Sequence, residues 1–94
     1  MSRFADYAVV YDISSNDERV KVARVLKGYG FRIQKSVFEC RLSRSGREKM
    51  IKELEGLGIK TGYIKIYRLE YSWKAPIIGK HDQQEPDEDS IFFV

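Results

Sequence analysis

The chain has 94 residues, with 17 Lys and Arg against 14 Asp and Glu, and a net charge of +3. This length suffices for one small domain with a modest core, so we expect a second subunit to add stability. The single cysteine, Cys40, excludes an intramolecular disulfide and, with His81 as the one histidine, argues against a structural zinc site.

Charge is distributed unevenly along the chain. Residues 1–80 hold all 17 Lys and Arg but nine of the 14 acids, and residues 81–94 hold the other five. A body this basic attracts polyanions, usually through phosphate contacts. The sequence shows neither an apolar run long enough for a membrane helix nor an apolar signal core after Met1. We therefore expect a cytoplasmic protein with no membrane partner.

The first predicted element is a strand over residues 5–13. This apolar run is rich in Val, Tyr and Ile, which is typical of a central strand buried on both faces. Near its end lies Asp12, followed by a polar turn. The carboxyl ends of buried strands are where α/β sheets tend to place their chemistry.

A helix is expected next, over about residues 16–28. Ser15 and Glu18 match a capping box, in which the serine accepts from the third helical amide and the glutamate reaches back to the serine amide. Gly28 and Gly30 follow, as expected for a left-handed C-terminal cap.

The alternation of apolar residues changes phase near Lys35, which indicates a bulge or a tight turn. We favour two short strands, 31–34 and 36–42, joined as a hairpin. Ser45 and Glu48 match a second capping box, which predicts a helix ending at Gly56 or Gly58. Residues 63–69 then have the composition of a strand.

This βαββαβ order predicts an α+β, ferredoxin-like sandwich over residues 1–79, with a four-stranded antiparallel sheet and two helices on one face. Residues 80–94 are expected to form an acidic linker and an extra C-terminal strand. The apolar ending of the chain, 91–94, favours docking of that strand on a sheet edge, with a partner subunit as the expected recipient.

Two segments of the chain, 9–14 and 30–40, with Arg19 between them, resemble the CRISPR-associated Cas2 family. The resemblance implies a homodimer of ferredoxin-like protomers whose sheets face each other, each C-terminal strand extending the partner's sheet. It also implies a role beside the CRISPR integrase, with a short DNA duplex held between integrase dimers. Several members of the family are described as magnesium-dependent endonucleases acting on RNA or DNA.

By position, Asp12 matches the metal-binding aspartate of that family, and four residues match positions associated with activity or the dimer centre. These four are Tyr11, Arg19, Arg32 and Phe38. One carboxylate is too little for Mg²⁺, but two copies of Asp12 across a two-fold axis could share an ion and activate a water. The alternative for Asp12 is a strand-end residue that accepts hydrogen bonds from the following turn.

The other site residues also have alternatives. A cation at Arg19, in the first helical turn, indicates either an anionic partner or an ion pair with Asp17, Glu18 or a carboxylate of a partner subunit. Arg32 is expected to reach outward to a phosphate or a dimer carboxylate. Phe38 is expected in the core or the dimer contact, with base stacking as the alternative.

Further basic residues are candidates for contacts with the phosphate backbone of duplex DNA or RNA, although any single one also fits ordinary surface charge. These residues are Lys21, Arg24, Lys27, Arg41, Arg44, Arg47 and Lys49.

Three functional hypotheses follow. The first is a homodimer that binds duplex DNA and supports spacer acquisition with the integrase. The second is a magnesium-dependent endonuclease that hydrolyses RNA or DNA through paired Asp12 residues. The third is a generic single-stranded RNA module that stacks bases on aromatic residues. Its candidate stacking residues are Tyr11, Phe38, Tyr63 and Tyr67.

Overall fold

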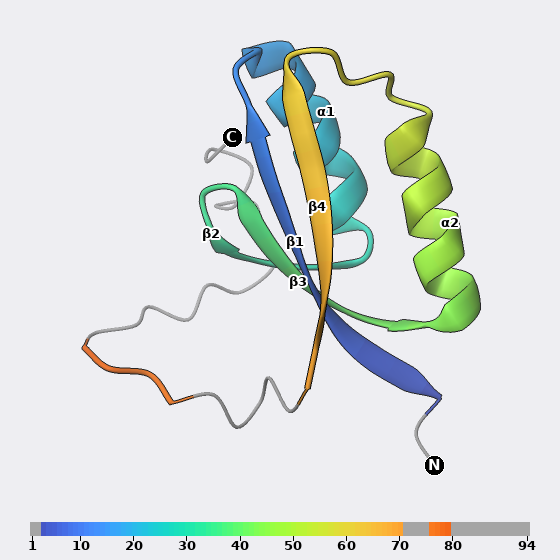
Figure 1. The fold of residues 1–94 in the computed structure, drawn as a ribbon, viewed down its shortest axis with the longest axis vertical. Helices are drawn as coiled ribbons and strands as arrows, with labels where there is room; N and C mark the ends of the chain where they lie inside the picture. Colours follow the sequence, from blue (N-terminus) through green and yellow to red (C-terminus); the bar gives the residue numbers. More distant parts are fainter. Residues whose placement is uncertain (1–2, 71–75, 80–94) are drawn as a thin grey trace.

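The computed structural model describes residues 3–70 and 76–79. Its elements are β1 (Phe4–Ile13), α1 (Asn16–Lys27), β2 (Gly30–Gln34), β3 (Val37–Ser43), α2 (Arg44–Glu55) and β4 (Gly62–Leu69), as Figure 1 shows. This order confirms the predicted βαββαβ arrangement. The linker and strand expected at 80–94 lie outside the described residues, and the domain boundary at residue 79 stays a prediction.

The four strands form one antiparallel sheet in the order β2-β3-β1-β4. β1 lies in the centre, where Val9 is paired with Phe38 of β3 on one side and with Ile66 of β4 on the other. The core is formed by one face of this sheet and by residues of both helices, among them Leu26 and Met50. The ferredoxin-like fold is therefore confirmed. Among the described residues, no helix is long and apolar enough to cross a membrane.

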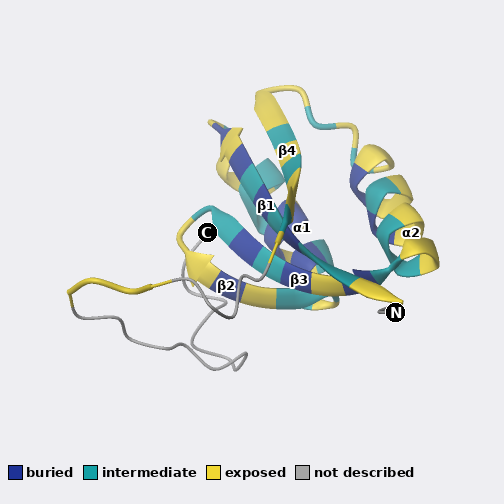
Figure 2. Ribbon diagram, turned by 60° about the horizontal axis from the view of Figure 1, so that its bottom comes forward, coloured by how far each residue is buried: buried dark blue, intermediate teal, exposed yellow. Residues whose placement is uncertain are grey.

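The two faces of β1 differ in burial, as the alternating colours in Figure 2 show. Tyr7, Val9, Tyr11 and Ile13 are buried beneath the helices, whereas the residues between them are half-buried and Asp12 is exposed. The expectation that this strand is buried on both faces is wrong for the single chain, because both helices cover the same face. Since successive side chains of a strand point to opposite faces, Tyr11 and Asp12 lie on different sides of the sheet.

We call the uncovered side the open face. It consists of the β1 residues whose side chains point to the same side of the sheet as Asp12, and of the residues paired with them on the other strands. Large apolar side chains lie exposed on it, with Phe31 52%, Tyr63 56% and Tyr67 45% accessible. Its residues are Asp6, Ala8, Val10, Asp12, Phe31, Val37, Glu39, Arg41, Tyr63, Lys65 and Tyr67.

The helix ends agree only in part with the capping motifs. Ser15 Oγ accepts from the Glu18 amide at 3.2 Å, as expected. The cap of the second helix is Ser43, two residues before the predicted cap, because β3 runs directly into the helix and Ser43 Oγ accepts from the Gly46 amide at 3.1 Å. Gly28 has φ −75°, so the predicted left-handed cap is wrong there.

The ends of α2 and of β2 are close to the predictions. α2 is capped by Gly56, one of the two expected ends, and the left-handed conformation occurs at Gly58, φ 63°. A turn at residues 35–36 joins β2 to β3, and their register also shifts between Arg32 and Gln34. The change of phase near Lys35 thus reflects both a turn and an irregularity.

Candidate functional site

Asp12 is exposed on the open face, one residue before β1 ends. Its register partner on β4 is Tyr63, whose ring is also exposed. The Asp12 carboxylate has no hydrogen bond or ion pair with any residue in the described part of the chain. The alternative reading, a carboxylate that accepts from the following turn, is therefore not observed.

Arg19 stabilises the turn that follows Asp12. Its Nη1 donates to the carbonyl oxygens of Ile13 at 2.6 Å and Ser14 at 3.0 Å, and its Nη2 donates to Asn16 Oδ1 at 3.0 Å. Its contacts are with backbone carbonyls and an amide rather than with Asp17 or Glu18, so the alternative of an ion pair with these two residues is not observed. The anionic partner stays a prediction. We infer that Arg19 is a positioning residue for the strand end that carries Asp12.

Glu18 attaches the same turn to the loop before β4. Its carboxylate accepts from the amides of Lys60 and Thr61, each at 3.0 Å, and from Thr61 Oγ1 at 2.6 Å. The hydrogen bond from the Thr61 hydroxyl and then that from the Lys60 amide hold the pKa of Glu18 below its ordinary value. The glutamate of the first capping box thus binds a loop 42 residues away rather than its own helix start.

Thr61 also contacts the turn directly. Its carbonyl oxygen accepts from the Ser14 amide at 3.0 Å, and its Oγ1 accepts from the Ser15 amide at 2.9 Å. No local motif in the sequence identifies Thr61, because its partners are 43 to 47 positions earlier. We call the contacts among Ser14, Ser15, Glu18 and Thr61 the Glu18 latch.

Arg32 points inward, which corrects the expectation that it reaches outward. Only 6% of it is accessible, and its guanidinium carbon lies 5.0 Å from the centre of the Phe38 ring. The reason is register, since Arg32 is paired with Phe38 and shares the covered face with it. Nη1 donates to the Lys35 carbonyl, while Nε and Nη2 are buried without a partner among the described residues.

Tyr11 lies in the same buried cluster as Arg32. Its hydroxyl donates to the Lys35 carbonyl at 3.3 Å, and burial raises its pKa, an effect that the nearby positive charge of Arg32 opposes. Phe38 is fully buried, which agrees with core packing and not with base stacking. Of the four aromatic residues offered for an RNA-stacking surface, Tyr63 and Tyr67 are exposed and Tyr11 and Phe38 are not.

The five predicted catalytic residues therefore do not surround one point. Asp12 lies on the open face, Arg19 braces the turn after it, and Tyr11, Arg32 and Phe38 pack together on the covered face. Within one chain, Asp12 is the member of this set that a substrate on the open face can reach. Of the other four, Arg19 contacts the backbone at this strand end, and Tyr11, Arg32 and Phe38 contact residues of the covered face or the turn after β2.

The residues present fit a magnesium ion only in part. Mg²⁺ is held by oxygen ligands, often one or two carboxylates with the remaining positions filled by water or phosphate. No group of three His, Cys, Asp or Glu suited to a metal occurs in residues 3–70 and 76–79. At this strand end each chain offers the single carboxylate of Asp12, so a complete site needs oxygen atoms from a second chain or from the nucleic acid.

The seven candidate phosphate contacts lie in three places. Lys21, Arg24 and Lys27 are on α1, and Arg44, Arg47 and Lys49 are in the first half of α2. Arg41 lies on the open face, where its Nε is 3.6 Å from the Asp6 carboxylate. The helix side of the molecule thus carries six of the seven.

The fold and the exposed strand-end aspartate define a small ferredoxin-like α+β protein, and comparison with known proteins gives its family. Residues 6–76 match the family described as CRISPR associated protein Cas2. The chain is 37% identical over 92 residues to the CRISPR-associated endoribonuclease Cas2 1 of Chloroflexus aurantiacus, covering 88% of this chain and 94% of that protein. The chain belongs to the Cas2 family of CRISPR-associated proteins.

Solved structures agree with this assignment. The hypothetical protein TT1823 from Thermus thermophilus has TM-score 0.76 at 33% identity, covering 87% of this chain and 99% of that one. A chain in a partial Cas6-RT-Cas1–Cas2 complex has TM-score 0.61 at 25% identity, covering 79% and 90%. The chain spans about half the length of several curated relatives, for example 54% of two from Mycobacterium tuberculosis.

Proposed function

We propose that the chain forms a homodimer through its open face and holds duplex DNA beside a CRISPR integrase during the acquisition of new spacers. The observation that carries this proposal is the division of the molecule into two sides. An exposed apolar sheet face lies on one side, and six of the seven candidate phosphate contacts lie on the other.

Pairing of two open faces would cover Phe31, Tyr63 and Tyr67, whose rings are about half exposed in the single chain. Burial of apolar area contributes roughly 25 cal/mol per Å². A small domain buries a limited area in its own core, so the area buried between two subunits would add to its stability. The helix sides would then face outward at both ends of the dimer. Their Lys and Arg would present positive charge to a nucleic-acid backbone without reading its sequence.

An integrase partner is supported by likeness to a solved chain whose description places it in a Cas1–Cas2 complex. In this role the chain needs no hydrolytic chemistry of its own. It needs a rigid, positively charged support for the duplex.

A second candidate is a magnesium-dependent endonuclease, which is favoured by the exposed carboxylate of Asp12, for which residues 3–70 and 76–79 supply no partner. Curated relatives carry the name endoribonuclease. Dimerisation through the open face would supply a second Asp12, and Mg²⁺ bound there would polarise a phosphate and lower the pKa of a bound water. Asp12 would hold the ion, while Arg19 and the Glu18 latch keep the strand end in position.

The test compares wild type with Asp12→Asn, using Asp17→Asn as a control for loss of one exposed carboxylate. Labelled duplex DNA and single-stranded RNA are incubated with each protein in magnesium or chelator, and binding is measured in parallel. We expect all three proteins to bind the duplex equally. Magnesium-dependent cleavage that is lost in Asp12→Asn and kept in Asp17→Asn would establish the second candidate. Absence of duplex binding by wild type would overturn the first.

A further inference from the structure

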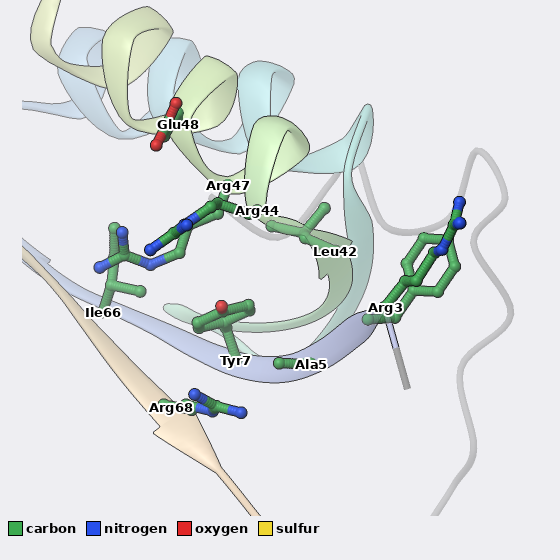
Figure 3. Close-up of a pocket in the computed structure, with 10 residues that line it drawn as sticks. Arg3, Ala5, Tyr7, Leu42, Arg44, Arg47, Glu48, Ile66 and Arg68 are labelled. Carbon is green, nitrogen blue, oxygen red and sulfur yellow. The ribbon is translucent and has the colours of Figure 1, made fainter. Parts of the chain in front are cut away.

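A cleft of ≈ 650 Å³ lies on the helix side of the sheet, at the end where β1 begins. Four arginines line it, namely Arg3, Arg44, Arg47 and Arg68, together with the aromatic ring of Tyr7 (Figure 3). They come from three separate parts of the chain, the start of β1, the first turn of α2 and the end of β4. The fold therefore gathers charges that are far apart in the sequence.

Register and packing place two of these arginines beside Tyr7. Arg68 is directly paired with Tyr7 across the β1–β4 ladder. The Arg47 guanidinium lies over the Tyr7 ring at 5.6 Å from its centre, a cation–π distance. This contact fixes Arg47 and leaves the edges of its planar group available for hydrogen bonds.

The positive charge of the cleft is not neutralised by the described residues. Glu48 is the one carboxylate that lines it, and the ion pair found in residues 3–70 joins Arg41 to Asp6 instead. The first turn of α2 contains no acid, and its helix dipole adds partial positive charge. The lining residues thus carry an excess of three positive charges.

An anion of matching charge would relieve this repulsion. Guanidinium groups bind phosphate through paired hydrogen bonds, and arginine suits this role better than lysine. One phosphodiester supplies a single negative charge, so an excess of three fits a run of adjacent phosphates. We propose that the cleft binds adjacent phosphate groups of a nucleic-acid strand, an inference that rests on the proposed nucleic-acid function.

The cleft is separate from the Asp12 site. Tyr7 and Asp12 are five residues apart on β1, about 16 Å along the strand, and they point to opposite faces. Pairing of two open faces would leave the cleft accessible on the outside of the dimer. It would therefore bind a nucleic-acid strand away from the proposed metal site. Arg44 and Arg47 were expected from the sequence to contact phosphates, and the cleft adds Arg3 and Arg68 to them.

The test uses Arg68→Ala, with Lys52→Ala as the matched control. Both changes remove one exposed positive charge, and Lys52 lies on α2 away from the cleft. Binding of a short labelled duplex is followed by fluorescence anisotropy over a range of salt concentrations. Inorganic tripolyphosphate is added as competitor, and its direct binding is followed by thermal shift.

We expect Arg68→Ala to weaken duplex binding about tenfold and to reduce the salt dependence by about one contact. Arg68→Lys should restore only part of the affinity, because it keeps the charge and loses the paired hydrogen bonds. Lys52→Ala should stay within about twofold of wild type. Tripolyphosphate should displace the duplex from wild type and bind Arg68→Ala more weakly.

Failure of this inference can be distinguished from failure of the proposed function. If Arg68→Ala and Lys52→Ala bind the duplex alike, the cleft is not a phosphate site and the proposed function stands. If wild type ignores the duplex but binds tripolyphosphate through Arg68, the cleft takes free polyphosphate and the nucleic-acid proposal is wrong. Failure to bind either probe overturns both.

Discussion

At the residue scale, Arg32 shows how register decides the environment of a charge. From the sequence, an arginine between Phe31 and Ile33 is expected to point to solvent. In the structure Arg32 is paired with Phe38, so its side chain lies on the face of the sheet that the helices cover. There it contributes a cation–π contact and one hydrogen bond to the Lys35 carbonyl, while two buried guanidinium nitrogens have no partner among the described residues. Arg32 therefore lies on the opposite side of the sheet from Asp12.

Glu18 gives a prediction about pH at the same scale. Since its folded-state pKa lies below the ordinary value of 4.5, its contribution to stability is fully present above pH 4.5 and is lost as the pH falls through the folded-state pKa. Glu18→Gln removes the charged acceptor from Lys60 and Thr61. We expect a lower melting temperature at pH 7 and a weaker loss of stability on acidification, measured by thermal unfolding between pH 3 and 7.

The control for this prediction is Glu55→Gln, which neutralises an exposed glutamate on α2. It should leave the melting temperature at pH 7 close to that of wild type. Equal behaviour of the two variants would show that the latch does not stabilise the fold.

At the element scale, the close approach of β4 to β1 depends on Gly62. A Cβ atom built there would lie 1.8 Å from the Asp12 carbonyl oxygen, so any side chain forces the backbones apart. We predict that Gly62→Ala destabilises the protein by about 1–3 kcal/mol, as overpacking does. Chemical denaturation measures this change, and it should also displace the strand end that carries Asp12.

Gly56→Ala provides the comparison, because its added Cβ would meet atoms no nearer than 3.4 Å and its φ is −65°. We expect no loss, or a gain of about 0.4–1 kcal/mol. A Gly62→Ala variant as stable as Gly56→Ala would mean that the β1–β4 ladder adapts to the side chain.

At the scale of the whole molecule, the open face governs assembly. We predict that Phe31→Glu, which places a charge on this face, shifts the protein from dimer to monomer, because a buried unpaired carboxylate opposes association. Light scattering coupled to size exclusion at micromolar concentration measures this. The fold should persist, since Phe31 is 52% exposed in the single chain.

Lys52→Glu on the helix side is the control and should remain dimeric. A monomeric wild type under the same conditions, or a Phe31→Glu protein that stays dimeric, would contradict assembly through the open face.

The sequence by itself determined the order of elements and the position of Asp12 at a strand end. These features are local, because periodicity, caps and turn residues act over a few positions. Local patterns also predicted the hairpin after the first helix. They predicted Ser45 as the N-cap of the second helix, whereas the structure has Ser43 there.

Only the tertiary structure decided which residues meet. Register placed Arg32 and Phe38 on the face opposite to Asp12, and the fold brought Thr61 to Glu18 and Arg68 to Tyr7. These contacts join positions more than 40 apart, and their geometry follows from strand order and register, which no local pattern encodes. The same reason explains why the arginine cleft was visible only as scattered charge in the sequence.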